Sequence, residues 1–176
     1  MKKLIILSLV FISLTFTVKA YNPEFNYSIT KRDTNKPATL SELLNLYYNI
    51  KNALVKSDAN LASEGASAFV KAIKDIDMKA MTEAEHNAFM PLQEKLTFDA
   101  EHIAESKDIA HQREHFETFS TNFYKLAKAV KLSENPVYQQ YCPMKKVYWL
   151  SSEAAIKNPY YGKQMLTCGK VTDTIK

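Results

Sequence analysis

Apolar residues recur at helical spacing in four successive stretches of the chain, and this periodicity constrains the fold more than any other feature of the sequence. The segments 39–42 and 82–85 both read Thr-x-x-Glu, a capping box in which the hydroxyl and the carboxylate satisfy free amides of a first helical turn. Breaks at Ser57-Asp58 and at Ser106-Lys107-Asp108 separate neighbouring stretches. The residues predicted to face inward are Leu40, Leu43, Leu44, Tyr47, Ile50 and Leu54, then Leu61, Ala62, Gly65, Ala66, Phe69, Val70 and Ile73, then Phe89, Leu92, Leu96, Ala100 and Ile103, and finally Ile109, Phe116, Phe119, Phe123, Leu126 and Val130.

These stretches predict an all-α fold, because four amphipathic helices of similar length with short links most economically form an antiparallel up-and-down four-helix bundle. Gly65 and Ala66 give the second helix a thin face that a neighbour can approach closely. Pro91 is expected to kink the third helix or to lie in its early turns.

The pattern changes after Lys131, where prolines and glycines break up regular helix. Residues 132–176 also hold many large aromatic side chains, which cannot all face water. We therefore predict that this segment packs across the bundle as an irregular aromatic-rich C-terminal cap, with a short helix around Lys163 to Thr167 that ends at Gly169. The aromatic residues are Tyr138, Tyr141, Tyr148, Trp149, Tyr160 and Tyr161.

Residues 1–20 have the pattern of a secretory signal peptide, because Lys2 and Lys3 precede an apolar run that closes on small residues up to Ala20. Several hydroxyl side chains dilute the run, which is too short for a transmembrane anchor. Residues 21–38 show no periodicity and are expected to form a flexible N-terminal arm. A single domain over residues 39–176 follows, and the predicted location is periplasmic or otherwise exported.

The basic charge of the chain belongs mostly to the predicted signal peptide. The formal net charge of +4 falls to +1 without residues 1–20, because Lys2, Lys3 and Lys19 leave and no acidic residue does. A nucleic-acid partner calls for a basic stripe that contacts many phosphates, and such a nearly neutral chain has none. No basic amphipathic helix points to a membrane surface either, so we expect no membrane insertion after signal removal.

Both cysteines lie in the predicted cap, and each has a methionine close by in the sequence: Cys142 with Met144, and Cys168 with Met165. Thiolate and thioether are soft donors that prefer Cu(I) to hard cations such as Mg²⁺. On a helical turn, Met165 and Cys168 at i and i+3 would face the same way. These four residues therefore form a candidate soft-metal site, although neither spacing matches a zinc signature.

A disulfide is the main alternative for the cysteines. Two cysteines of an exported protein most often form a bridge, which for a loop of this length contributes about 3–4 kcal/mol. The methionines would then fill gaps under the cap. A bridged sulfur cannot serve as a thiolate ligand, so bridge and metal exclude each other at any instant, and a free reactive thiol is the third alternative.

His102 falls near the end of the third helix, and His111 and His115 fall at i and i+4 near the start of the fourth. A tight hairpin would bring His102 and His111 to similar heights, which makes a histidine cluster at one end of the bundle geometrically feasible. His102 is accordingly a candidate additional ligand for the cysteine and methionine set, provided that the chain returns along the bundle. If the return is shorter, the two groups are separate.

Several strings carry a family resemblance: His102-Ile103, Gln112-Arg113, Phe116 to Ser120, Tyr141-Cys142-Pro143-Met144, Trp149-Leu150-Ser151, Asn158-Pro159-Tyr160-Tyr161-Gly162 and Met165-Leu166-Thr167-Cys168-Gly169. From Leu40 to Ile175 the chain resembles an uncharacterised bacterial helical domain, found alone in exported proteins and at the C-terminal end of periplasmic adaptor subunits of heavy-metal efflux pumps. The resemblance implies a periplasmic helical domain in the company of copper export. The family usually has a longer loop between Cys-Pro-Met and Trp-Leu-Ser, a difference that affects Met144 most.

Two functional hypotheses follow. In the first, the domain binds a soft metal ion, most favourably Cu(I), and buffers it or hands it to an efflux adaptor. In the second, it is a disulfide-stabilised protein-interaction module of the cell envelope without metal. We expect no enzymatic activity, because the sequence has no Gly-rich phosphate loop, nucleophile elbow, HExxH or CxxCH motif.

Arg113 is expected to bind carbonyl groups or a carboxylate of the C-terminal cap through its guanidinium.

Overall fold

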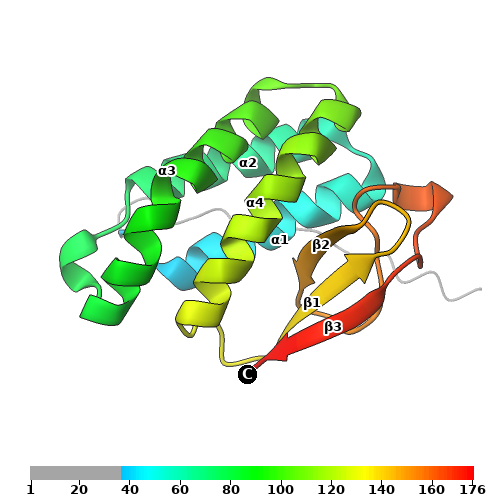
Figure 1. Cartoon of the computed structure of the whole chain (residues 1–176). Helices are drawn as coiled ribbons and strands as arrows, with labels where there is room; N and C mark the ends of the chain where they lie inside the picture. Colours follow the sequence, from blue (N-terminus) through cyan, green and yellow to red (C-terminus); the bar gives the residue numbers. More distant parts are fainter. Residues whose placement is uncertain (1–36) are drawn as a thin grey trace, which may run out of the picture.

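Four long helices form the body of the protein (Figure 1). The computed structural model describes residues 37–176, so the predicted signal peptide and nearly all of the predicted arm lie outside the described residues. The helices are α1 (Leu40–Lys56), α2 (Ala59–Lys74), α3 (Glu83–Glu105) and α4 (Ile109–Ala129), with a short 3₁₀ helix, η1 (Met78–Ala80), between α2 and α3. Consecutive helices pack against each other. The predicted helical bundle is therefore confirmed.

The helices begin where the caps in the sequence predict. At the start of α3, the Thr82 hydroxyl accepts a hydrogen bond from the Glu85 amide and the Glu85 carboxylate accepts one from the Thr82 amide, a complete capping box. The Thr39 hydroxyl accepts from the Glu42 amide at the start of α1. Asp58 and Asp108 cap α2 and α4 with their carboxylates. Because each cap satisfies amides that no helical carbonyl can reach, these ends are fixed by local sequence.

Aromatic side chains fill the centre of the bundle. The ring of Tyr47 stacks on three phenylalanine rings of α4, with centroid distances of 5.4 Å to Phe116, 5.6 Å to Phe119 and 4.9 Å to Phe123. Phe69 of α2 meets the Phe119 ring edge-on at 4.9 Å. All five side chains are fully buried, so α1, α2 and α4 share one core.

Two residues that interrupt helices are accommodated inside them. The predicted close approach at the thin face of α2 is confirmed, since a Cβ on Gly65 would lie 3.4 Å from the Ile50 side chain of α1. Pro91 lies within α3, which continues to Glu105. Its ring faces solvent. None of the helices in residues 37–176 is both long and apolar enough to cross a membrane.

The C-terminal segment is a small antiparallel sheet, so the prediction of an all-α fold with an irregular cap was wrong there. Strands β1 (Val137–Cys142), β2 (Val147–Ser151) and β3 (Lys170–Ile175) pair in the order β2-β1-β3. Their β-branched and aromatic residues favour strands, although each run is short and lies near proline or glycine. The predicted short helix is replaced by η2 (Gly162–Gln164), a 3₁₀ turn that ends before Met165.

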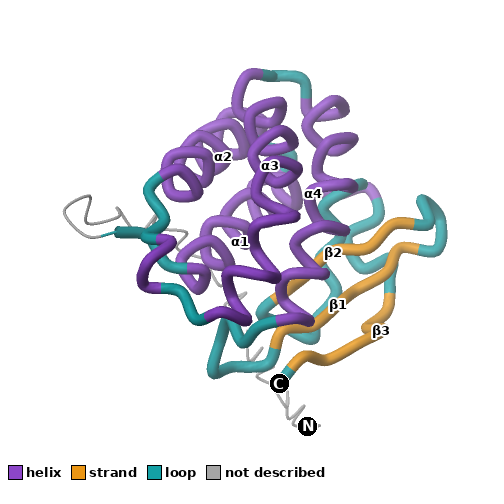
Figure 2. Tube along the Cα trace, turned by 60° about the vertical axis from the view of Figure 1, so that its left-hand side comes forward, coloured by secondary structure: helices purple, strands orange, loops and turns teal. Residues whose placement is uncertain are grey.

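The sheet packs on the outer side of α4, with β2 nearest to it and β3 outermost (Figures 1 and 2). Tyr47 joins the sheet to the bundle. Its buried hydroxyl oxygen accepts a hydrogen bond from the Leu150 amide of β2 at 2.9 Å and lies 2.7 Å from the Ser120 hydroxyl of α4. This contact gives an edge amide of β2 a partner inside the protein, which fixes the sheet against both α1 and α4.

Candidate metal centre

Cys142 is the last residue of β1 and lies at the mouth of the β1–β2 hairpin. It pairs with Val147 of β2, and its carbonyl oxygen accepts the Lys146 amide at 2.8 Å across the four-residue connection. Lys146 closes this connection with φ of +62°. The tight return points backbone amides of the loop at the Cys142 sulfur, and the side chain itself is buried.

Cys168 comes from the turn that leads into β3. Its amide donates to the Met165 carbonyl at 3.1 Å, and β3 then pairs with β1 through Lys170 and Tyr141. Gly169 makes this approach feasible, because its φ of +153° disfavours other residues. An added Cβ there would lie 2.9 Å from the Tyr141 carbonyl oxygen and 3.0 Å from the Trp149 ring. The strand pairing thus brings Cys168 next to Cys142.

The two cysteines are free thiols, and they are hydrogen-bonded to each other. Burial raises the pKa of Cys142, but hydrogen bonds to its sulfur outweigh burial and hold the pKa below its ordinary value. The donors are the Lys145 amide, the Asn158 side chain, the Met144 amide and the Cys168 thiol. Burial raises the pKa of Cys168, and its hydrogen bond and charge interaction with Cys142 raise it further. Of the two thiols, Cys142 is therefore the one with the lower pKa and loses its proton more readily than Cys168.

Asn158 is the buried residue that holds this arrangement. Its Nδ2 donates to the Cys168 carbonyl oxygen at 2.8 Å, and its Oδ1 accepts the Tyr160 amide at 2.8 Å. Its own amide donates to the Leu166 carbonyl oxygen at 2.8 Å. Asn158 belongs to one of the strings that carry the family resemblance, but no role in the site was predicted for it. An asparagine directly before a proline was the available signal, because this residue pair favours a turn.

The two methionines lie on the segments that carry the thiols. Met144 is at the tip of the hairpin with 63% of its surface exposed, more than any other large hydrophobic residue between positions 37 and 176. Met165 follows η2 and is half-buried. Met165 and Cys168 span a hydrogen-bonded turn outside any helix, so they do not lie on one face of a helical turn as the sequence predicted. Both thioethers remain candidate donors on either side of the thiol pair.

His102 lies in a different group. Its ring nitrogens gather with those of His111 and His115 where α3 turns into α4, and neither cysteine belongs to that group. The thiol-bearing hairpin instead meets α4 near Glu117, whose carboxylate lies 3.9 Å from the Lys145 ammonium. The chain does return along the bundle, but its hairpin reaches α4 through Lys145 at Glu117, while the imidazoles gather between α3 and α4.

Arg113 connects the bundle to the C-terminal segment as the sequence predicts. Its Nε donates to the Pro159 carbonyl oxygen at 2.8 Å. Its Nη2 donates to the Leu54 carbonyl oxygen at 3.1 Å and to the Ser57 hydroxyl at 2.8 Å. One guanidinium thus binds the end of α1 and the loop before η2 to α4.

Comparison with known proteins identifies the family but no characterised relative. A family model described as a protein of unknown function, DUF3347, matches residues 43–135, which hold all but the first three residues of α1, the other three long helices and all three clustered imidazoles. The match ends before the sheet and both cysteines. Neither a curated protein nor a solved structure matches the chain. The family model covers more than half of the sequence, so the chain belongs to the DUF3347 family.

Proposed function

We propose that the domain binds a soft monovalent cation, Cu(I), between Cys142 and Cys168, and that it buffers the ion or delivers it to an export system. The observation that carries the proposal is the hydrogen-bonded thiol pair, in which one sulfur already accepts backbone amides. Thiolate is the metal-binding form of cysteine, and Cu(I) is satisfied by few soft donors. Binding of Cu(I) by both sulfurs as thiolates would release to solvent the protons that the two thiols carry.

The surroundings of the thiols support ion transfer. Cys142 is fully buried, while Cys168 is half-buried and therefore nearer to solvent. The exposed Met144 on the same hairpin offers a third soft donor that an incoming ion would meet first. Met165 offers a fourth from the Cys168 side. A graded path from an exposed thioether to a buried thiolate suits a protein that accepts an ion and later releases it.

The cellular role is proposed from the sequence. The pattern of residues 1–20 supports export, and the resemblance to domains of heavy-metal efflux adaptors supports a role beside such a pump. An efflux adaptor is the proposed recipient of the ion. The proposal includes no catalytic step.

A second candidate function rests on the same adjacency of sulfurs. Thiols close enough to share a hydrogen bond need little movement to form a disulfide in an oxidising compartment. The bridge would stabilise the C-terminal sheet, and the domain would then act as an envelope interaction module. Metal binding and bridging compete for the same two atoms.

Anaerobic Cu(I) titration of the reduced mature protein against a chromophoric chelator separates the two functions. We expect one Cu(I) per chain, and a loss of affinity of at least about a hundredfold for Cys142→Ser or Cys168→Ser, beyond the 10–100-fold typical of partners outside the coordination shell. Met144→Leu should weaken binding less, and Met90→Leu, an exposed methionine on α3, serves as its matched control. A reduced chain that leaves all Cu(I) with the chelator, together with thiol counting that finds the native pair oxidised, would establish the interaction module instead.

A further inference from the structure

Three of the four histidines converge at the connection between α3 and α4. One ligand nitrogen from each of His102, His111 and His115 can be chosen so that all three lie within 4.8 Å of one another. The rings of His102 and His115 stack at 4.3 Å with an interplanar angle of 8°, and the His111 ring stands at 64° to that of His115, 4.7 Å away. All three side chains are half-buried, so they reach solvent without being loose on the surface.

We propose that these three imidazoles form a second metal site, which takes a divalent transition-metal ion of borderline softness such as Zn(II). Three imidazole donors suit Zn(II) and its neighbours in the transition series, and a site with three protein ligands leaves a coordination position for water. Ligands about 2 Å from a common ion lie at most about 4 Å apart, so nitrogens separated by up to 4.8 Å would have to move closer together to bind one ion. Because imidazole lone pairs lie in the ring planes, the His102 and His115 rings would turn out of their parallel stack on binding, so that both lone pairs point at the same ion.

A buried carboxylate orients one of the ligands. Asp99 of α3 is 4% exposed, and its Oδ1 lies 3.3 Å from Nδ1 of His115. The same oxygen accepts the Thr118 hydroxyl at 2.7 Å, which holds the carboxylate in place. A hydrogen bond from Nδ1–H to Asp99 would leave the lone pair of Nε2 for a metal, the arrangement common around metal-bound histidines. Asp99 is therefore a positioning residue for the site.

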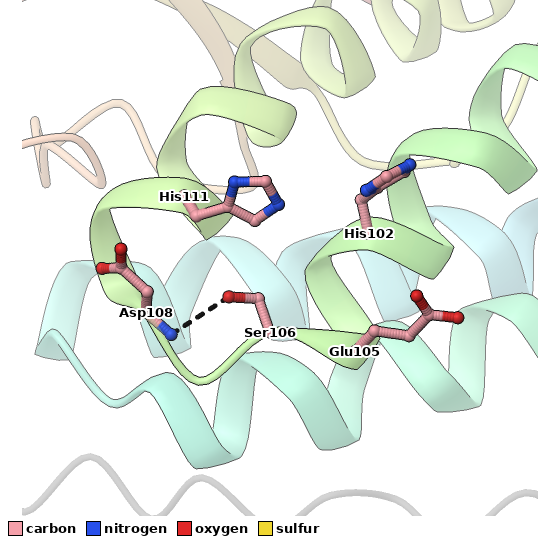
Figure 3. A pocket seen from close by; sticks show the side chains of 5 residues that line it. All are labelled: His102, Glu105, Ser106, Asp108 and His111. Carbon is pink, nitrogen blue, oxygen red and sulfur yellow. Dashed lines mark hydrogen bonds between the residues drawn. The ribbon is translucent and has the colours of Figure 1, made fainter.

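The site opens into a pocket of about 430 Å³. His102, His111, Glu105, Ser106 and Asp108 line the pocket, and Figure 3 shows the two imidazoles on adjacent helices with Ser106 below the gap between them. Glu105 and Asp108 add two carboxylates at the entrance, and negative charge there favours the approach of a cation. The half-exposed Phe98 ring also packs on the cluster, with its centroid 4.4 Å from that of His102 and 5.9 Å from that of His115.

This site is independent of the proposed thiol function. It uses other residues, and all of them fall within the segment that matches the family. Zn(II) also binds thiolates, so the experiment removes the sulfurs first. The test protein is the mature chain with Cys142→Ser and Cys168→Ser, studied by competitive Zn(II) titration and by absorption of Co(II), which reports the coordination of the ion.

We expect one Zn(II) per chain in this double variant and a four-coordinate Co(II) spectrum. His102→Ala, His111→Ala and His115→Ala should each weaken binding at least tenfold. His86→Ala is the matched control, since His86 lies on the same helix about 24 Å from His102 at 1.5 Å per residue and should change nothing. Asp99→Asn should weaken Zn(II) binding about 10–100-fold with a shifted Co(II) spectrum, and this shift separates positioning from a merely structural role.

Three results would overturn the inference. These are absence of Zn(II) binding in the folded double variant, binding unaffected by His111→Ala, or an equal loss in His86→Ala. If the double variant does not fold, Co(II) bound to the reduced wild-type chain decides, because sulfur ligation gives charge-transfer bands and imidazole ligation gives none. Cu(I) bound by the wild type without Zn(II) in the double variant would leave the thiol function intact and remove only this site.

Discussion

The helical body and the C-terminal sheet are built on different kinds of information. In the body, each helix begins at its own cap and places its apolar residues by its own period. In the sheet, β1 pairs on one side with the strand that follows it and on the other with β3, whose Ile175 lies opposite Val137 at the far end of the segment. A helix is specified within a few turns, whereas a strand is specified by partners that the local sequence does not contain.

The same contrast separates the two candidate metal sites. His111 and His115 are one helical turn apart, and a short hairpin adds His102, so local rules bring the imidazoles together. The thiols meet only because β3 returns to β1 after a long connection. In this protein and its variants, the imidazole site should therefore form whenever the α3–α4 hairpin is folded. The thiol site should form only when the strands of the sheet pair correctly.

The largest expected effects test whether body and sheet unfold as one unit. Phe119→Ala in the body and Trp149→Ala in β2 each remove a fully packed ring, so each should lower the free energy of unfolding by about 3–5 kcal/mol. Because Tyr47 joins α1, α4 and β2, we expect a single cooperative transition. Urea unfolding followed by far-UV circular dichroism and by fluorescence of Trp149, the only tryptophan of the chain, should give coincident curves in the wild type and in Phe119→Ala. Separate midpoints would show that the sheet is an independent unit.

The bundle was predictable from the sequence, and the sheet was not. Capping boxes predicted the helix starts at Thr39 and Thr82. The breaks at Ser57-Asp58 and Ser106-Lys107-Asp108 include the residues that cap the other two helices. The strand at residues 147–151 is instead buried at Val147, Trp149, Leu150 and Ser151, so it shows little of the alternation that identifies a half-exposed strand. The two cysteines could be grouped from the sequence as soft donors, and the three histidines from the hairpin between α3 and α4. The place of Asn158 beside the thiols could not be predicted, because it follows from tertiary packing.

Arg113 tests the connection between body and sheet directly. Arg113→Ala leaves the buried carbonyl groups of Leu54 and Pro159 without this donor and should cost about 2–3 kcal/mol. Arg113→Lys keeps the charge, but an ammonium cannot reproduce the fork that reaches both carbonyls, so it should recover only part of the loss. Urea titration measures both, and full recovery in Arg113→Lys would show that charge alone is required.

Lys51 of α1 is a buried cation that faces the C-terminal segment. Burial lowers its pKa to about 8, with Glu153 acting in the opposite direction and Lys157 adding to the lowering. Because the folded pKa lies below the unfolded value of 10.5, protonated Lys51 destabilises the fold below about pH 8, and the penalty fades as pH rises from there toward 10.5. Lys51→Met should therefore stabilise the protein by about 2 kcal/mol at pH 7. Thermal melts of both proteins between pH 7 and 9.5 should show the difference shrinking, and a constant difference would assign the gain to packing.

Thr82 gives the smallest effect and probes the body alone. Thr82→Ala removes the hydroxyl that accepts the Glu85 amide and should cost about 1 kcal/mol, whereas Thr82→Ser keeps the acceptor and should cost much less. The hydrogen bonds from Thr82 hold the pKa of Glu85 below its ordinary value, so the difference between wild type and Thr82→Ala should be present at neutral pH and shrink as Glu85 protonates in acid. The cap lies at the end of α3 remote from His102, and among the long helices it is α4, not α3, against which the sheet packs. Thr82→Ala should therefore leave the reactivity of Cys142 and Cys168 toward a thiol reagent unchanged in native buffer. Increased thiol reactivity in Thr82→Ala but not in Thr82→Ser would mean that a local helix signal also governs the pairing of the strands.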